Sequence, residues 1–342
     1  MRHIIIPLLC LLVPCSFAIA QDTEMDQAIE RALEFLHRTQ DQNGAWRVGN
    51  TPHPAITSLA VMAFLSAGHV PGEGPYGATV ERGVRWVLTK QQPNGVIATD
   101  GGHEMYHHGI CTLMLAEVVG MCEPNLAAEV RAKLEKAVQI ILKAQLLRGE
   151  HRGGWRYRVQ SSDADISVTG WQVMALRAAK NLGCDVPPER LQLAVDYIKR
   201  CQDTRSGGFR YMIGSHITVP CTGTSILALE LCGKEQHRSP ELLKAGSYLL
   251  QNAPTWNSNH FFYAVYYCSQ AMFQLGGTHW AAFRPKLHHA LLPNQKSNGS
   301  FDSRGGDGYG PNYGTAMAVL ALTVEYRLLP IYQRGDDSAE AP

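Results

Sequence analysis

The hydrophobic positions along this chain follow two alternating patterns, both with the period of an α-helix. In the first pattern, apolar residues recur at helical spacing among charges, as in Met25–Thr39 and Leu191–Gln202. Such a segment predicts a helix with one buried and one exposed face. The second pattern is apolar nearly all round and rich in small residues, which predicts a helix buried on both sides. Segments of this second kind are Ala55–Ala67, Val168–Ala179, Thr222–Cys232 and Thr315–Thr323.

A short phrase separates the two kinds of segment and recurs along the chain. It starts with Gln, continues with polar residues, and in most copies reaches Gly and an aromatic residue, as in Gln40–Trp46. The glutamines are Gln40, Gln91, Gln145, Gln202, Gln251 and Gln295, spaced by 51, 54, 57, 49 and 44 residues. The copy at Gln251 leads to Trp256 without glycines. The spacing predicts one helix-pair unit copied along the chain, with the phrase as its turn.

Six such pairs predict an all-α protein with two concentric layers of helices. The fully buried helices form the inner layer, and the amphipathic helices form the outer layer. An open array of repeats needs polar capping units at its ends. The sequence shows no such unit, so we expect a closed ring.

The two ends of the chain differ from the repeats. Residues 1–20 have a basic start, a short apolar stretch and small residues at Ala18 and Ala20, so we expect a signal peptide cleaved after Ala20. Residues 21–334 then form one domain. The polar, acidic residues 335–342 are expected to form a disordered tail. The expected location of the product is periplasmic or secreted.

Charge and cysteine content narrow the classes of function. Of the 31 Lys and Arg, only Arg2 lies in the leader, which leaves 30 basic residues against 30 acidic ones. This balance does not favour nucleic acid, an anionic membrane or an acidic polymer as partner. The cysteines after the leader are irregularly spaced and show no CxxC pair. We therefore expect buried thiols in place of a disulfide framework.

The QxxxGxW-like phrases, the helix alternation and the closing segments Tyr263–Gly277 and Tyr309–Arg334 resemble the repeats of squalene–hopene cyclases and protein prenyltransferase β subunits. The resemblance covers the whole mature chain and implies an (α/α)6 toroid of the terpenoid cyclase-like type. In that superfamily the inner helices begin at one rim of a central cavity, where functional groups gather. The residues at such positions here are His107, His108, Asp163, Asp165, Cys221, His260, Tyr263 and Tyr313.

Asp163-Ala164-Asp165-Ile166 resembles the DxDD motif of cyclases that protonate an alkene. The resemblance makes Asp165 the catalytic acid and Asp163 its partner, although Ile166 replaces the last Asp of the motif. This chemistry needs a carboxylic acid that is kept protonated. The structural alternative is that Asp163 caps the following helix and Asp165 complements the helix dipole.

Cys221 and His260 resemble two of the three zinc ligands of prenyltransferase β subunits, where zinc activates a substrate thiol. The position of the third ligand holds Val219. The alternative is a packed cysteine and a histidine at the rim. His103–His107 also matches the HExxH pattern of zinc proteases, but at a loop-to-helix junction. Zinc is the one cofactor that these residues suggest.

Aromatic residues near the rim indicate the class of ligand. In a cyclase, tyrosines such as Tyr263, Tyr267 and Tyr313 would stabilise carbocations, and with His107 they would line the cavity. The leading hypothesis is an exported cyclase- or prenyltransferase-like toroid that cyclises or binds an apolar, isoprenoid-like ligand. One alternative is a non-catalytic toroid that binds a lipid or a partner protein. The other is an exported enzyme acting on polysaccharide or peptide with zinc at its rim.

Overall fold

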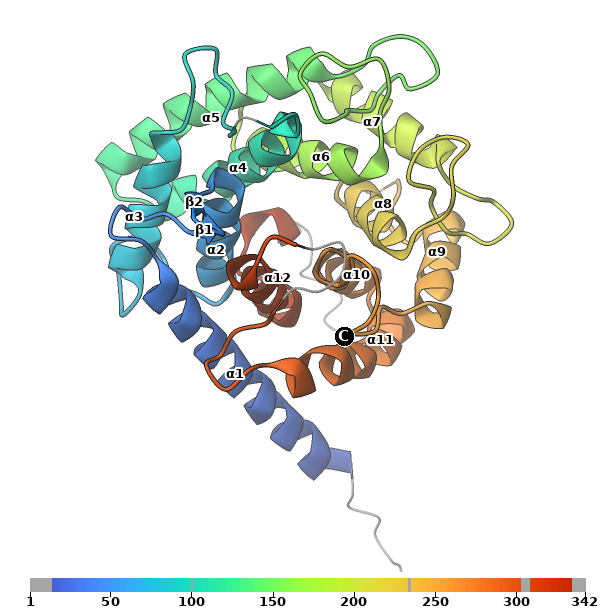
Figure 1. Cartoon of the computed structure of the whole chain (residues 1–342). Coiled ribbons are helices and arrows are strands. Elements are labelled where there is room, and N and C mark those ends of the chain that lie inside the picture. Colours follow the sequence, from blue (N-terminus) through green and yellow to red (C-terminus); the bar gives the residue numbers. More distant parts are fainter. Residues whose placement is uncertain (1–13, 100, 233–234, 303–307, 334–342) are drawn as a thin grey trace, which may run out of the picture.

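The computed structural model describes residues 14–99, 101–232, 235–302 and 308–333. Within these residues the chain is all-α, as predicted, with twelve α-helices in two concentric rings (Figure 1). The exception is a small antiparallel hairpin of β1 (Arg47–Val48) and β2 (Thr51–Pro52). Most of the predicted signal peptide and all of the predicted tail, residues 335–342, lie outside the described residues.

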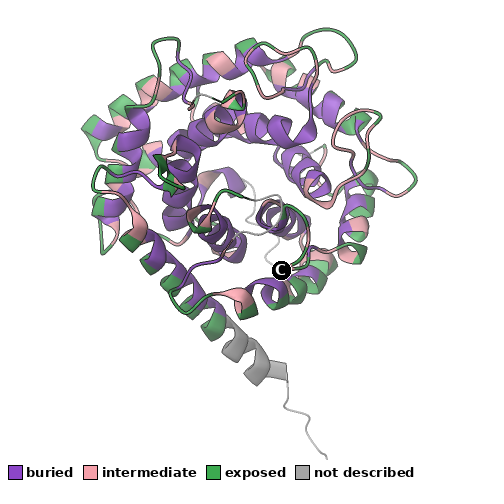
Figure 2. Ribbon diagram, viewed as in Figure 1, coloured by how far each residue is buried: buried purple, intermediate pink, exposed green. Residues whose placement is uncertain are grey.

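The inner ring consists of the helices that the sequence predicts to be buried on both sides. They are α2 (Pro54–Ser66), α4 (Glu104–Val118), α6 (Ile166–Asn181), α8 (Val219–Leu231), α10 (Phe261–Leu275) and α12 (Pro311–Leu322). Each packs against the next, and α12 packs against α2, so the ring is closed. Figure 2 shows that nearly all of their residues are buried. Small residues permit this packing, because a Cβ on Gly170 would lie 2.1 Å from the Thr224 side chain of α8.

The outer ring consists of the amphipathic helices. They are α1 (Pro14–Thr39), α3 (Gly77–Leu88), α5 (Pro124–Ala144), α7 (Pro188–Arg200), α9 (Pro240–Gln251) and α11 (Gly277–Leu291). Each buries one face against the inner ring and exposes the other (Figure 2). The predicted cleavage point after Ala20 falls within α1. Four 3-10 turns complete the described chain: η1 (Val119–Met121), η2 (Leu292–Asn294), η3 (Val324–Tyr326) and η4 (Pro330–Tyr332).

The repeated glutamine joins neighbouring outer helices. The Gln40 side-chain amide donates to the Gly44 carbonyl of its own turn at 3.0 Å and to the Thr79 carbonyl of α3 at 2.9 Å. Four more glutamines make the same pair of bonds: Gln91, Gln145, Gln202 and Gln295. Because Gln295 reaches the Ala28 carbonyl of α1, the outer ring is closed as well. Each amide therefore ties a carbonyl of its own turn to a carbonyl of the neighbouring helix, where it adds a second hydrogen bond to a carbonyl that already accepts one within the helix.

Glycine allows each turn to press against the next outer helix. Gly153 has φ of 99°, and a Cβ on it would lie 1.9 Å from the Leu193 carbonyl oxygen of α7. Gly299 has φ of 89° and meets the Arg31 carbonyl of α1 in the same way. Only a residue without a Cβ fits both the left-handed backbone and the close contact.

In four of the six phrases a threonine near the start of the inner helix holds the aromatic end of the phrase. The backbone N–H of Trp46 donates to Oγ1 of Thr57 at 2.9 Å, and Trp155, Phe209 and Phe301 make the equivalent bond. In the second repeat His108 takes the place of this threonine. Its Nδ1 accepts from the Ile97 N–H at 3.1 Å, and its Nε2 donates to the Ala137 carbonyl at 3.0 Å. His108 is therefore part of the scaffold, contrary to its prediction as a rim residue.

The fifth repeat departs from the others in register. In the intact repeats the acceptor carbonyl lies 12 residues before the next glutamine, as Lys133 precedes Gln145. On α9 the acceptor is Glu241, which places the structural counterpart of the glutamine at Ala253. Gln251 is instead the last residue of α9 and makes neither bond within the described residues. The prediction that Gln251 opens the fifth turn is wrong. The sequence pattern does not determine which carbonyl of α9 accepts the bond from Gln202, and this carbonyl sets the register.

Two further findings concern membrane-spanning helices and the cysteines. Along the described part of the chain, no helix combines the length and apolar character needed to cross a membrane. The seven cysteines from Cys111 to Cys268 are free thiols, and five of them are buried. The expectation of packed thiols is confirmed.

We expect Gln145→Ala to lower the free energy of unfolding by about 2–4 kcal/mol, because the carbonyls of Gly153 and Arg190 lose a buried donor. Gln251→Ala is the matched control and should change stability by less than about 0.5 kcal/mol. Urea unfolding followed by circular dichroism measures both variants. Equal losses in the two variants would contradict the joining role of Gln145.

Candidate functional site

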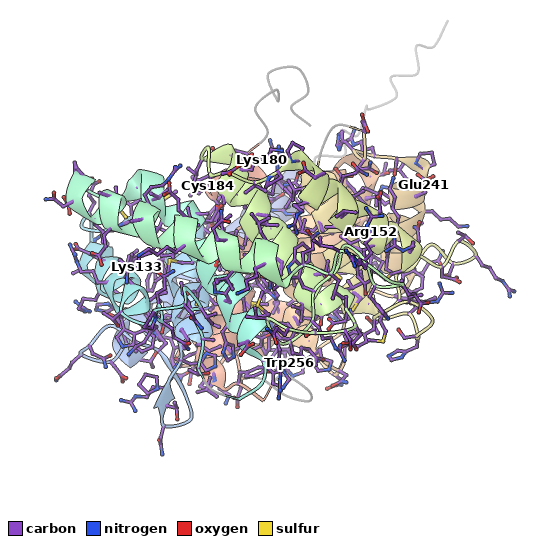
Figure 3. The ribbon with its side chains drawn as sticks, turned by 90° about the horizontal axis from the view of Figure 1, so that it is seen from above. Lys133, Arg152, Lys180, Cys184, Glu241 and Trp256 are labelled. Carbon is purple, nitrogen blue, oxygen red and sulfur yellow. The ribbon has the colours of Figure 1, made fainter. Side chains whose placement is uncertain are left out.

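The six inner helices run in the same direction, because each is linked to the next through an outer helix that runs back. Their N-terminal ends form one face of the molecule, which we call the mouth. In Figure 3 Trp256, which precedes α10, lies at this face, whereas Lys180 and Cys184 at the end of α6 lie at the opposite one. The ring thus brings the predicted rim residues to one face: His107, Asp163, Asp165, Cys221, His260, Tyr263 and Tyr313.

Arg156 is the centre of a polar network at the mouth. Its Nη1 lies 2.6 Å from Oδ2 of Asp165 and donates to the Tyr211 hydroxyl at 2.6 Å. Its Nε lies 3.3 Å from Oδ2 of Asp163, and its guanidinium lies over the Tyr157 ring at 4.2 Å. Sequence reasoning missed Arg156. The sequence feature that could have indicated Arg156 is its position directly after Trp155, the aromatic residue of the third phrase.

Asp165 is the N-cap residue of α6. Its Oδ1 accepts from the Val168 N–H at 2.9 Å and from the Ser167 hydroxyl at 2.5 Å, while Oδ2 accepts from Arg156. The side chain is fully buried. These donors occupy both oxygens of the carboxyl group, whereas a cyclase acid must face the alkene that it protonates. The cap that the structural alternative assigned to Asp163 is made by Asp165, and Asp163 is a half-exposed partner of Arg156.

Tyrosines line the mouth around this network. The hydroxyls of Tyr157 and Tyr211 are hydrogen-bonded to each other, and the Tyr106 ring stacks on Tyr157 at 5.7 Å. The Tyr263 hydroxyl bonds to Oγ1 of Thr224 at 2.8 Å. Burial raises the pKa of Tyr106, Tyr211 and Tyr263 well above that of free tyrosine. All three present neutral hydroxyl groups at neutral pH.

Cys221 and His260 differ in their surroundings. Burial raises the pKa of the Cys221 thiol to about 12, whereas a zinc ligand is a thiolate. His260 precedes α10 in a left-handed conformation, with φ of 53°. Among the described residues, no three His, Cys, Asp or Glu side chains are close enough together to hold a metal ion. Zinc at Cys221 and His260 stays a prediction, without a third ligand in this part of the chain.

His107 faces His53 across the mouth. Their ring centroids are 4.4 Å apart in an edge-to-face arrangement, and His107 Nδ1 accepts weakly from the Thr99 N–H at 3.4 Å. Burial lowers the pKa of His107 to about 3 and that of His53 to about 4, so both are neutral at pH 7. In the HExxH-like segment, Glu104 accepts from the Val159 N–H at 2.8 Å. Glu104 therefore anchors a neighbouring loop.

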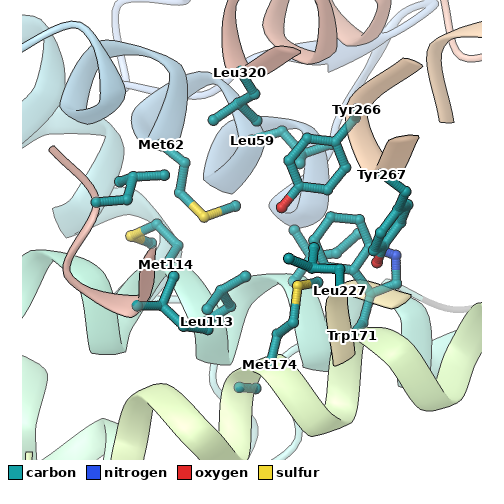
Figure 4. Close-up of a cluster of buried hydrophobic side chains, with 14 of the residues drawn as sticks. Leu59, Met62, Leu113, Met114, Trp171, Met174, Leu227, Tyr266, Tyr267 and Leu320 are labelled. Carbon is teal, nitrogen blue, oxygen red and sulfur yellow. The ribbon is translucent and has the colours of Figure 1, made fainter. Parts of the chain in front are cut away.

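The centre of the inner ring, which we call the lumen, is filled by apolar and aromatic side chains (Figure 4). They come from all six inner helices and include Leu59, Met62, Leu113, Met114, Trp171, Met174, Leu227, Tyr266, Tyr267 and Leu320. None of these is more than 2% exposed. The central cavity that the resemblance implied is therefore closed in this structure.

The predicted cavity residues occupy different depths. Tyr267 lies in the lumen, and its hydroxyl has no hydrogen-bond partner within the described residues. Tyr263 lies one helical turn nearer the mouth, with its ring 4.8 Å from that of Tyr267. Tyr313 is nearly buried, and its ring packs edge-on against Phe262 and Tyr309.

The C-terminal segment around η4 covers the end of the lumen opposite the mouth. The Tyr332 hydroxyl lies 2.8 Å from that of Tyr266, and the Ile331 N–H donates to Oε2 of Glu117 at 3.2 Å. Glu117 is 1% exposed, and burial raises its pKa to about 8. Sequence reasoning missed Glu117, because its partner lies more than two hundred residues further along the chain.

A family model described as the prenyltransferase alpha-alpha toroid domain matches residues 7–150 and 156–324. The chain belongs to this family. The expected terpenoid cyclase-like superfamily and toroid fold are thereby confirmed. No curated protein is detectably similar to this sequence.

Two solved structures illustrate the functions that share this fold. One is a variant of the type II terpene cyclase MstE from Scytonema in complex with its substrate geranylgeranyl dihydroxybenzoate, with 15% identity and a TM-score of 0.63, over 91% of this chain and 100% of that chain. The other is an inactive variant of an α-1,6-mannanase from Salegentibacter sp. HEL1_6 in complex with α-1,6-mannotriose, with 14% identity and a TM-score of 0.67, over 89% and 99%. At these identities the likeness shows the fold alone.

We expect Glu117 to make the protein less stable as the pH rises from about 4.5 to about 8. In this window the unfolded state has released the Glu117 proton and the folded state retains it, so each added pH unit favours unfolding. Glu117→Gln should remove this contribution. The variant should gain stability over the wild type by on the order of 1.4 kcal/mol for each pH unit in the window. Denaturant unfolding at several pH values measures the gain, and a gain independent of pH would contradict the assignment.

Proposed function

We propose that this protein binds an amphipathic, isoprenoid-like lipid without cyclising it. The observation that carries the proposal is the succession of zones along the ring axis. A polar mouth around Arg156 leads, through Tyr263, to a largely apolar lumen. A ligand with a polar head and an isoprenoid tail matches both zones, since binding sites combine apolar walls with a few placed polar groups.

Entry of the tail requires the lumen side chains to move. Three methionines, Met62, Met114 and Met174, meet there from three different inner helices. Methionine is unbranched and repacks readily around different shapes. The Tyr267 hydroxyl, which lacks a partner within the described residues, offers a hydrogen bond to a ligand atom. A bound tail would replace the methionine contacts with its own and satisfy this buried hydroxyl.

Binding without turnover follows from the surroundings of Asp165. A cyclase acid must hold a proton and face the alkene. Both Asp165 oxygens already accept hydrogen bonds, one from Arg156 and the other from the first turn of α6. The Asp165 carboxylate therefore positions Arg156 and starts α6, and the proposed role of Arg156 is to contact the lipid head.

One of the solved structures that share the fold holds this class of ligand. The substrate held by MstE joins a geranylgeranyl chain to a dihydroxybenzoate head, which has the same division into tail and head. The mannanase holds a sugar instead, but side chains such as Leu59, Leu113 and Leu227 offer no hydrogen bonds to one. The predicted signal peptide supports an exported protein, so the proposed binding takes place in the periplasm or outside the cell.

Lipid extraction of protein purified from its natural host, followed by mass spectrometry, tests the proposed ligand class. We expect an isoprenoid lipid in near-stoichiometric amount. Recovery of protein with no lipid that also fails to bind added geranylgeraniol would refute the proposal.

Incubation of the wild type with geranylgeraniol tests the absence of turnover. Gas chromatography should recover the alcohol unchanged, because both oxygens of Asp165 are already occupied by hydrogen bonds within the protein. A cyclised product that disappears in Asp165→Asn would show that Asp165 is a catalytic acid. It would contradict the proposal that the protein binds the lipid without turnover.

We expect Met114→Ala to lose about 2–5 kcal/mol of stability and to bind geranylgeraniol more tightly than the wild type, because the substitution opens space in the lumen. Leu134→Ala removes a comparable buried side chain from the outer helix α5 and should lose stability without gaining affinity. The ligand-induced rise in melting temperature measures affinity in all three proteins. Equal rises in the two variants would place the ligand outside the lumen.

A further inference from the structure

A groove of about 580 Å³ lies in the outer ring between α9 and α11, on the same face as the mouth. Its walls are the end of α9, the loop of residues 252–257, α11 and η2. Its lining combines apolar residues such as Leu250 and Pro254 with polar, basic and aromatic ones, namely Gln251, Trp256, Asn257, Lys286, His289 and Asn294. We call it the α9–α11 groove.

The groove lies at the junction where the turn lacks both the repeated glutamine and the glycine. In the second repeat Gly95 approaches the Lys136 carbonyl of α5, and a Cβ there would come within 3.3 Å of it. Lys136 precedes Gln145 by nine residues, and Lys286 precedes Gln295 by the same number. Lys286 is therefore the matching position on α11. The fifth turn has Ala253 in place of the glutamine and no glycine, so it lacks the two residues that bring the other turns against the next outer helix.

The lining of the groove has the chemistry of a sugar site. The Trp256 indole is partly exposed, and Phe261 and Phe262 hold it edge-on at 5.1 and 5.7 Å. A fixed, flat indole offers a face on which a sugar ring can stack. Around it, the side-chain amides of Gln251 and Asn257 offer both donors and acceptors for hydroxyl groups.

The charge of the groove is one-sided. Lys286 and His289 lie on the same helix and are both exposed, and Lys286 forms no ion pair within the described residues. No acidic side chain belongs to the part of the lining that the structure describes. The near-zero net charge of the whole chain therefore conceals a local basic site that suits a carboxylate.

We propose that the α9–α11 groove binds an acidic saccharide. One sugar ring stacks on Trp256, its carboxylate pairs with Lys286 beside His289, and its hydroxyls bond to the amides of Gln251 and Asn257. This site is separate from the lumen and does not rest on the proposed binding of a lipid. It gives the exported protein a means to attach to acidic glycans while its lumen remains free.

Isothermal titration calorimetry with a trimer of galacturonic acid tests the site in the full-length mature protein. We expect saturable binding at one site, and binding of neutral α-1,6-mannotriose at least about tenfold weaker, since the neutral sugar lacks the charge-assisted bond. Lys286→Gln should weaken binding of the acidic trimer at least about tenfold, and Trp256→Ala should abolish it.

Lys136→Gln is the matched control, because it removes the same charge from the same repeat position beside an intact turn. It should bind the acidic trimer like the wild type. Circular dichroism checks that each variant is folded, and if Trp256→Ala is not, Lys286→Gln alone decides. The proposal is overturned by absence of saturable binding to the wild type, by equal affinity for the neutral trimer, or by equal losses in Lys136→Gln and Lys286→Gln.

Discussion

The structure depends on hydrogen bonds that join each turn to the next outer helix. A ring of helix pairs places a turn against the side of a helix, where the carbonyl of the turn has no helical donor and a carbonyl of the helix can accept a second bond. The repeated glutamine provides two N–H groups from one side chain, one for its own turn and one for the neighbouring helix. The accompanying glycine lets the backbones come close enough for this reach. Everything at the mouth inherits its position from these junctions.

Departures from the repeat are informative for this reason. His108 replaces a threonine and still supplies an acceptor and a donor, so the scaffold is preserved by different chemistry. Ala253 stands where the repeat has a glutamine and brings no side-chain amide, and the α9–α11 groove lies at that junction. In this protein a departure from the repeat therefore coincides with a candidate site.

Much of the fold could be read from the sequence, because helical periodicity and a spaced phrase are local signals that the ring preserves. The convergence of Asp165, Cys221 and Tyr263 at one face also followed from the expected direction of the inner helices. The roles of these residues could not be read in the same way. Whether Asp165 holds a proton depends on Arg156 and on the first turn of α6, and both lie beside it only once the chain has turned.

The remaining features rest on contacts between distant segments. In the sequence Glu117 is only an acid near the end of an apolar helix, and its partner Ile331 lies in the last described turn. The register of α9 depends on which of its carbonyls accepts the hydrogen bond from the Gln202 side chain, and a sequence pattern does not determine this. The lumen is closed because large side chains from six helices meet at one point, a sum that no single helix reveals.

Closure of the outer ring through Gln295 has a consequence for how the chain is made. The partner of Gln295 is Ala28, so α1 can make this contact only after almost the entire chain has been synthesised. Contacts of such sequence separation form late and slow the final folding step. During synthesis the early repeats can pair with one another but keep an open seam. A chain interrupted before its sixth repeat leaves the ring open. The uncovered apolar face of α1 can then associate with other chains.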